Sequence, residues 1–312
     1  MKLNKVYLSV KIVVVVTLLL LNNCSSGSKP KKIVYVIDTS NDRIISFSNF
    51  SGTTFSSSFG SAGSGVGQFS LPLDLEIFGG KIYILDSANH RLVRMDNMSG
   101  DGWTTLGTFG SGVGQFNSPT GLHIDSLGLI YIADRLNHRI VRMNDITGAG
   151  WGSIGSIGSG VFQFNSPSDI VTNTNYLYAA DGGNDRVVRM NLDGATGWFT
   201  SGSTGSSTNQ YNEPLGIDLD SSGRIYIADF FNSRIVRIDN IIGDGFVSVN
   251  GLGQPRNVHI GPSNQIYTSA YNAGQKVFRF DDMIKSNLVE FGESGTGDGQ
   301  FTNPASVFVI KK

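Results

Sequence analysis

One short unit recurs along this chain at a nearly constant interval. In residues 130–143, two apolar segments flank a short polar loop. Related units occupy residues 33–47, 82–95, 177–190, 225–238 and 266–280. In the first five units an aspartate ends the first apolar segment, and these aspartates follow one another at intervals of 48, 48, 47 and 48 residues. A fixed period of this length is typical of repeat architectures, in which each unit packs against its neighbours.

Each unit is predicted to form a β-hairpin, because its two segments are rich in β-branched and aromatic residues. Asp134 and Arg139 would then face each other as a charged cross-strand pair, and Asn137 suits the left-handed or Asx-type backbone of the loop. The equivalent residues are Asp38, Asp86, Asp181 and Asp229, with Arg43, Arg91, Arg186 and Arg234. Because this set repeats, we interpret it as turn-stabilising and not as a binding ring. The sixth unit has Ala270 and Lys276 instead.

A second motif separates the hairpins and completes the repeat. It reads GQFSLP at residues 67–72 and GQFNSP at residues 114–119, and its proline opens a further strand, where a missing N–H does little harm. With a fourth apolar stretch after each hairpin, the sequence predicts an all-β fold, a six-bladed β-propeller of four-stranded blades over residues 33–312. The first repeat lacks its proline-led strand and the last lacks its hairpin. The C-terminal strand is therefore expected to join the N-terminal blade and close the ring.

Residues 1–23 differ from the repeats and resemble a bacterial lipoprotein signal peptide. Lysines precede or interrupt an apolar run over residues 6–21, which is shorter than a usual membrane span. Cys24, the single cysteine, follows at the position that is lipidated in such signals, although Asn22 and Asn23 stand where small residues are usual. The resemblance implies a membrane anchor on Cys24, a tether over residues 24–32 and an extracytoplasmic location in the cell envelope. An ordinary secretory signal and a retained membrane anchor are the alternatives.

The hairpins resemble NHL repeats, whose hallmarks are a proline-led strand, a hydrophobic strand ending in Ala-Asp and an Asn-x-Arg-Ile segment. Residues 130–140 and 225–235 carry these hallmarks most closely. The resemblance covers residues 33–310 and implies a six-bladed propeller but no single activity, since members include RNA-binding and protein-binding platforms and amidating lyases. In those lyases, zinc-binding histidines follow the prolines. The residues that follow the prolines here are Leu73, Thr120, Ser168, Leu215, Arg256 and Ala305. None is a histidine, so that zinc site is not expected.

The proline-led strands of a propeller line its central channel, and here their polar side chains differ from repeat to repeat. Two and four residues after the prolines, the sequence places Asp74, Glu76, His123, Asp169, Asp218, Asn257 and His259. Carboxylates beside histidines can coordinate Ca²⁺ or, less readily, a transition metal, and they can also act as general acid and base. A water-filled polar channel is the simpler interpretation. Apart from this Ca²⁺ site, no cofactor is predicted.

These features together predict that the protein binds another protein or a small ligand. A net charge of −1 gives no electrostatic attraction to nucleic acid, and the arginines are spread around the ring, so nucleic acid is not an expected partner. We expect a lipid-anchored propeller that acts as a scaffold for an envelope protein or a small ligand. The alternative is a metal-assisted hydrolase or lyase that uses the channel carboxylates and histidines. The divergent hairpin at residues 270–276 is expected to make a specialised contact.

Overall fold

The computed structural model describes residues 32–48, 55–194 and 196–311. The predicted signal peptide, Cys24 and the tether up to residue 31 lie outside the described residues. Lys32, which the sequence assigned to the tether, instead begins the first strand. It pairs with Lys311, and its Nζ donates a hydrogen bond to Gln265 Oε1 (2.7 Å). Within the described ranges, no helix is long and apolar enough to cross a membrane.

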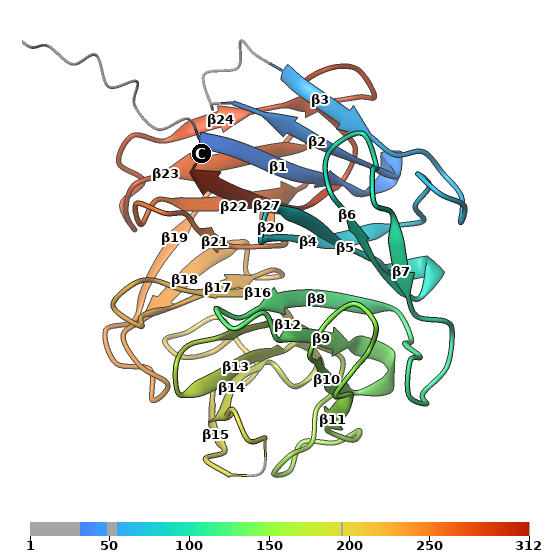
Figure 1. Ribbon diagram of the computed structural model, residues 1–312. Helices are drawn as coiled ribbons and strands as arrows, with labels where there is room; N and C mark the ends of the chain where they lie inside the picture. Colours follow the sequence, from blue (N-terminus) through green and yellow to red (C-terminus); the bar gives the residue numbers. More distant parts are fainter. Residues whose placement is uncertain (1–31, 49–54, 195, 312) are drawn as a thin grey trace, which may run out of the picture. The chain divides into compact units, whose positions relative to one another are not determined.

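The described chain is all-β and forms six blades around a ring, which confirms the prediction of a six-bladed propeller (Figure 1). Blade 1 comprises β27 (Pro304–Lys311), β1 (Lys32–Asp38), β2 (Arg43–Phe47) and β3 (Phe55–Phe59). Blade 2 comprises β4 (Pro72–Phe78), β5 (Lys81–Asp86), β6 (Arg91–Met95) and β7 (Thr104–Leu106). Blade 3 comprises β8 (Pro119–Ile124), β9 (Ile130–Asp134), β10 (Arg139–Met143) and β11 (Gly152–Ile154).

The remaining blades follow the same order. Blade 4 comprises β12 (Pro167–Thr172), β13 (Tyr176–Asp181), β14 (Arg186–Asn191) and β15 (Phe199–Ser201). Blade 5 comprises β16 (Pro214–Leu219), β17 (Ile225–Asp229), β18 (Arg234–Ile238) and β19 (Val247–Asn250). Blade 6 comprises β20 (Gln254–Pro255), β21 (His259–Ile260), β22 (Ile266–Tyr271), β23 (Lys276–Phe280) and β24 (Val289–Phe291). A parallel pair, β25 (Glu293–Ser294) and β26 (Gln300–Phe301), follows.

Two strands from distant parts of the chain close the ring. β27 pairs antiparallel with β1, from Lys32 opposite Lys311 to Asp38 opposite Pro304, and Figure 1 shows the dark red strand beside the blue one. The predicted ring closure is thus confirmed. The closure pairs β1 on both sides, with β2 and with β27, so β1 is not left as an open edge.

The strands are buried on both faces because each blade lies between two others. All five residues of β9 are buried. Ile132 of β9 belongs to a hydrophobic cluster with Leu85 of blade 2, and the neighbouring Tyr131 belongs to one with Ile170 of blade 4. This two-sided burial explains why β9 is continuously apolar instead of alternating.

The hairpin loop of blade 3 shows how the repeated polar set is used. Asp134 and Arg139 are cross-strand neighbours, with Arg139 Nε 2.7 Å from Asp134 Oδ2. The loop contains a 3₁₀ turn, η3 (Arg135–Asn137), so the left-handed residue is His138 (φ 54°) and the expectation for Asn137 was wrong. Asn137 instead donates its side-chain amide to Asp134 Oδ2 and to the carbonyl oxygen of Gly110, both at 2.8 Å. The matching turns are η1 (Thr39–Asn41), η2 (Ser87–Asn89) and η4 (Gly182–Asn184).

In the five blades that carry it, the arginine joins the hairpin to the glycine-rich loop that precedes the blade. In blade 3, Arg139 Nη1 and Nη2 donate to the carbonyl oxygens of Ser111 (2.6 Å) and Gln115 (2.9 Å). In blade 6 only residues 251–253 separate β19 from β20, so this loop is missing. An arginine in this hairpin would find no loop carbonyl oxygens to bind, and Ala270 and Lys276 replace the aspartate–arginine pair. Lys276 Nζ instead lies 2.6 Å from a carboxylate oxygen of Glu290.

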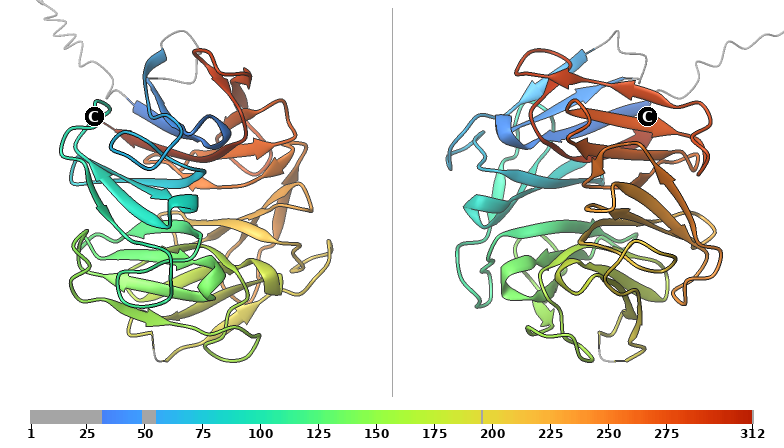
Figure 2. Two further views of the ribbon diagram at one scale, coloured as in Figure 1. Left: turned by 90° about the vertical axis from the view of Figure 1, so that its right-hand side faces the viewer. Right: turned by 180° about the vertical axis from the view of Figure 1, so that it is seen from behind.

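The pairing of the strands also orients the channel. In five blades the proline that opens the inner strand lies opposite the hairpin aspartate, as Pro119 lies opposite Asp134, and in blade 6 Pro255 lies opposite Ala270. The inner strands therefore begin at the face of the ring that carries the hairpin loops, which we call the hairpin face and which the left view of Figure 2 presents. They then run along the channel toward the opposite face.

Candidate functional site in the central channel

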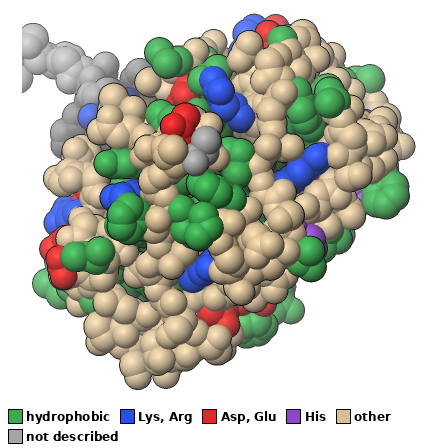
Figure 3. Space-filling view, turned by 90° about the horizontal axis from the view of Figure 1, so that it is seen from below, with side chains coloured by type: hydrophobic (Ala, Val, Ile, Leu, Met, Phe, Trp, Pro, Cys, Tyr) green, Lys and Arg blue, Asp and Glu red, His purple; other side chains and the backbone are tan. Residues whose placement is uncertain are grey.

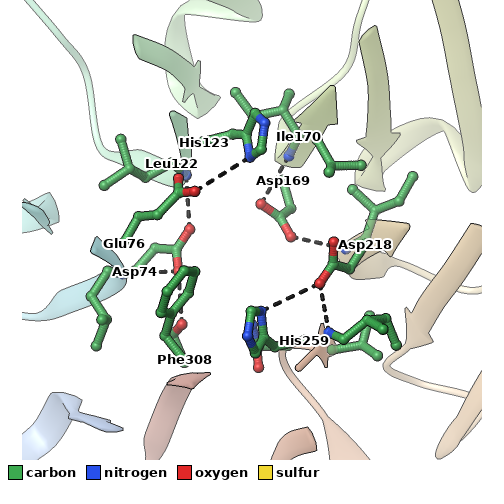
Figure 4. Close-up of a pocket in the computed structure, with 16 residues that line it drawn as sticks. Asp74, Glu76, Leu122, His123, Asp169, Ile170, Asp218, His259 and Phe308 are labelled. Carbon is green, nitrogen blue, oxygen red and sulfur yellow. Dashed lines mark hydrogen bonds and ion pairs between the residues drawn. The ribbon is translucent and has the colours of Figure 1, made fainter. Parts of the chain in front are cut away.

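All seven predicted channel residues line one cavity on the axis of the ring (Figure 4). The cavity has a volume of about 230 Å³. Its polar and aromatic side chains come from all six blades and are Asp74, Glu76, His123, Asp169, Asp218, Asn257, His259, Ser306 and Phe308. The alternation of side chains along each inner strand therefore placed these residues correctly.

The aspartates two residues after the prolines hold neighbouring blades together. Asp74 Oδ2 accepts a hydrogen bond from the N–H of Leu122 in blade 3 (2.8 Å), and Asp169 Oδ2 accepts one from Ile217 in blade 5 (2.9 Å). The Oδ1 atom of each aspartate accepts from the N–H of the next residue in its own strand, and Ser306 Oγ also donates to Asp74 Oδ1 (2.7 Å). Both oxygens of each carboxylate are thus engaged by groups of the frame.

Close packing explains why these side chains do not occur in every blade. A Cβ on Gly121 would lie 2.5 Å from the Cα of Asp169, and one on Gly216 would lie 2.8 Å from the Cα of Asn257. Blades 3 and 5 therefore cannot accommodate a side chain at this position. Blade 6 can, and Asn257 Oδ1 accepts from the N–H of Val307 (3.3 Å). The differences between blades that suggested function thus have a packing cause as well.

Two acid–histidine pairs lie four residues after the prolines. His123 Nδ1 is 3.7 Å from Glu76 Oε1, and His259 Nδ1 is 3.3 Å from Asp218 Oδ2. The first pair comes from blades 2 and 3 and the second from blades 5 and 6, so they face each other across the channel (Figure 4). Asp218 also accepts from the N–H of Ile260 (2.6 Å), so this acid too supports the neighbouring strand.

The second ring nitrogens of the two histidines differ in their surroundings. His123 Nε2 lies 2.9 Å from Thr172 Oγ1. His259 Nε2 is buried without a hydrogen-bond partner among the described residues, and its ring packs against Phe308 with centroids 4.4 Å apart. His259 therefore offers a polar atom that a ligand in the channel could satisfy.

Burial shifts the pKa values of the channel groups toward their neutral forms. It raises the pKa of Asp74 to about 6, against the hydrogen bond from Ser306, and lowers the pKa of His123 to about 4. Burial also raises the pKa of Glu76 and Asp169 well above their ordinary values, and nearby carboxylates add to the effect. The contact between Glu76 and His123 therefore favours two neutral groups over an ion pair.

A divalent cation in the channel would need several free oxygen ligands from these side chains. Ca²⁺ takes about six to eight oxygen ligands at short distances. Within the described ranges, no three His, Cys, Asp or Glu side chains are arranged so that they could hold a metal ion. The carboxylates of Asp74 and Asp169 moreover accept backbone N–H groups on both oxygens. As arranged, these residues do not fit Ca²⁺.

Two features of the hairpin face were not predicted from the sequence. The left-handed loop residue accepts a hydrogen bond from the N–H that precedes the next proline, as His138 Nδ1 does from Ser166 (3.0 Å). The same contact is made by Asp42, His90, Asp185 and Gln275. The residues that follow the prolines also line a second, smaller cavity together with Arg135. A polar residue after each hairpin asparagine was a visible signal for the first feature, whereas nothing in the sequence directed Arg135 to the channel axis.

Two repeats of this chain match the NHL repeat family, at residues 116–143 and 211–238. These matches and the ring of blades support an NHL-type β-propeller. The sequence comparison with curated proteins finds no relative.

Solved structures share the fold at low sequence identity. A chain of the nidogen/laminin complex superposes with a TM-score of 0.67 at 18% identity, over 89% of this chain and 98% of that one. A streptogramin B lyase gives 0.56 at 13%, over 85% and 80% of the two chains. Virginiamycin B lyase from Staphylococcus aureus gives 0.57 at 15%, over 85% and 82%. At these identities the likeness concerns the fold alone.

Proposed function

We propose that this propeller is a binding scaffold of the cell envelope, anchored by a lipid on Cys24, and that it holds a protein or a small ligand without transforming it. The proposal rests on the hydrogen bonds that the channel carboxylates accept. Asp74 and Asp169 direct both oxygens at backbone N–H groups. Redirecting such an acid to a metal or a reacting proton would leave buried donors unpaired. The channel acids therefore belong to the frame, and recognition falls to the surface loops.

The structural neighbours are compatible with this function. The nidogen/laminin structure is named as a complex, so a propeller of similar shape takes part in an assembly there. On the side of this ring seen in Figure 3, hydrophobic side chains form several separate groups with Lys, Arg, Asp and Glu between them. That side presents no single broad apolar patch, so the two faces of the ring are the better candidates for a binding surface.

The anchor is tested by metabolic labelling with a fatty-acid analogue. The wild-type chain is expected to take up the label and to fractionate with membranes. Cys24→Ala is expected to lose both properties, whereas Ser25→Ala, a substitution beside it, keeps them. Labelling that persists in Cys24→Ala would contradict the anchor proposal and would leave the scaffold proposal unaffected.

The scaffold is tested by photo-crosslinking in intact cells from either face of the ring. Val113 and Leu136 are exposed on loops of the hairpin face, whereas Leu127 and Ile242 are exposed on loops of the opposite face. A crosslinker at one pair is expected to yield an adduct of defined mass that the other pair does not yield. Equal, diffuse adducts from both faces, or none from either, contradict a specific partner.

A second candidate function is favoured by His259. Its buried, unpartnered Nε2 and the two facing acid–histidine pairs are suited to proton transfer, and two of the neighbouring folds are lyases. This alternative, a metal-assisted hydrolase or lyase, requires a divalent ion that the scaffold does not need. The two functions therefore differ in how the protein responds to removal of metal.

A further inference from the structure

A small cavity opens the channel at the hairpin face, and two arginines reach it. This cavity, which we call the mouth cavity, has a volume of about 60 Å³. It is lined by Leu73, Thr120, Arg135, Ser168, Leu215, Arg256 and Ala305. Except for Arg135, these are the residues that directly follow the prolines, so the mouth cavity lies at the hairpin-face end of the inner strands. It has room for a group of a few non-hydrogen atoms.

Arg256 brings a positive charge to this cavity. Among the described residues its guanidinium makes one side-chain hydrogen bond, from Nη1 to Asn303 Oδ1 (2.8 Å), and no ion pair. Burial, followed by the positive charge of Arg135, lowers the pKa of Arg256. A partly buried charge without an opposite partner is costly for a folded protein. The other inner strands carry a neutral residue at this position, so the repeat does not require an arginine here.

Arg135 approaches from another blade. Its Nη2 lies 2.9 Å from Glu213 Oε1, at the start of blade 5, although Arg135 itself belongs to the hairpin loop of blade 3. Blade 4, which lies between them, has Gly182 at the equivalent loop position. The Nε of Arg135 is buried without a hydrogen-bond partner among the described residues. Both arginines thus converge on the channel axis with donors to spare.

We infer that the mouth cavity binds a carboxylate group through Arg256 and Arg135. Two guanidinium charges less the one carboxylate of Glu213 leave a single positive charge, which matches a monoanion better than a dianionic phosphate. The planar fork of a guanidinium suits a carboxylate with two parallel hydrogen bonds. The inference rests on the proposed binding function and names the chemistry of what is bound: either a free small carboxylate or one carried by a protein partner.

Thermal unfolding of the detergent-solubilised full-length protein provides the test. At equal pH and ionic strength, sodium acetate is expected to raise the unfolding midpoint above that in sodium chloride by about 2–4 °C if its concentration is well above Kd. Arg256→Gln is expected to lose this difference, whereas Arg94→Gln, an equal change of charge on an outer strand, keeps it. In chloride, Arg256→Gln is expected to unfold at the same temperature as wild type or higher, because an unpaired cation is removed.

Two further probes separate the sources of the carboxylate. A short peptide without acidic side chains, with a free C-terminus, is compared with its C-terminally amidated form. A shift with acetate supports a free ligand, and a shift with the free-acid peptide alone supports a partner chain. No shift with either, an equal shift with inorganic phosphate, or a lowered midpoint of Arg256→Gln in chloride overturns the inference. Face-specific crosslinks that survive this failure leave the scaffold proposal standing.

Discussion

His138 Nδ1 accepts a hydrogen bond from the backbone N–H of Ser166 at 3.0 Å, and this contact ties the hairpin loop of blade 3 to the start of blade 4. We expect His138→Ala to lower the free energy of unfolding by about 1 kcal/mol, because the N–H of Ser166 loses its acceptor. His138→Asp is the matched control, since Asp42 and Asp185 make the same contact in other blades. Urea unfolding of the three proteins provides the comparison. Equal losses in both variants would show that the histidine ring acts by packing and not as an acceptor.

The buried ion pair of Asp134 and Arg139 is expected to affect the free energy of unfolding far more than an exposed ion pair would. The side chain of Asp134 is fully buried, so Arg139→Met leaves an uncompensated carboxylate and should cost about 3–5 kcal/mol. The double variant Asp134→Ala/Arg139→Met is expected to cost less than the sum of the single changes. Arg142→Met, at an exposed position of the same strand, serves as the control. Additive losses in the double-mutant cycle would contradict the coupling.

Asp74 should make stability fall as pH rises. Its pKa is about 6 in the folded protein, above the ordinary value of 3.8, so between these values the folded state binds more protons than the unfolded state. The contribution is fully present below pH 3.8 and is lost as pH rises through about 6. Asp74→Asn is expected to reduce the loss of stability over this pH range by on the order of 1–3 kcal/mol. Asn257 shows that an amide fits the equivalent position. An unchanged slope in Asp74→Asn would refute the assignment.

His123 should act in the opposite sense. Burial lowers its pKa from 6.5 to about 4, so between these values the unfolded state binds more protons and stability falls as pH falls. His123→Gln, which keeps a polar group near Thr172, is expected to remove that loss. Unfolding midpoints measured at several pH values between 4 and 7 for wild type and variant decide the matter. A steeper acid loss in the variant than in wild type would contradict it.

Removal of metal should leave the protein unchanged. Because the channel carboxylates are engaged by N–H groups, we expect equal unfolding midpoints with and without EDTA and no stoichiometric metal by elemental analysis. Bound Ca²⁺ or Zn²⁺ that disappears in Glu76→Gln or His259→Gln would favour the hydrolase or lyase alternative. The same analysis on Glu290→Gln, an acidic surface position, controls for adventitious binding.

The architecture could be predicted from the sequence because residues with the same role recur at intervals of 47 or 48 residues. The interval between Asp86 and Asp134 sets the blade length, and the proline-led strand at residues 304–310 reveals the ring closure. The convergence of Asp74 and His259 on the channel followed from the alternation of side chains. The sequence did not reveal that both oxygens of Asp74 accept hydrogen bonds, because the donors Leu122 and Ser306 lie in other blades.

Local geometry and long-range reach account for the remaining differences. A short 3₁₀ turn moves the left-handed position from Asn137 to His138, a shift that residue preferences alone do not determine. Arg135 meets Glu213 across an intervening blade, and no local pattern signals such a contact. The missing loop before blade 6 explains why Ala270 and Lys276 replace the aspartate and arginine of the other blades. A specialised contact at this hairpin stays a prediction.

The pairing of β1 with β27 has a consequence for how the molecule is made. β1 lies near the beginning of the chain and its partner near the end, so β1 must wait during synthesis until almost the whole chain has emerged. Until then its inner edge has free N–H and C=O groups, which attract other strands. Contacts this distant in sequence also form slowly. The nascent chain is therefore exposed to misassembly until its last strand arrives, and chaperones that act on it would be most needed in that interval.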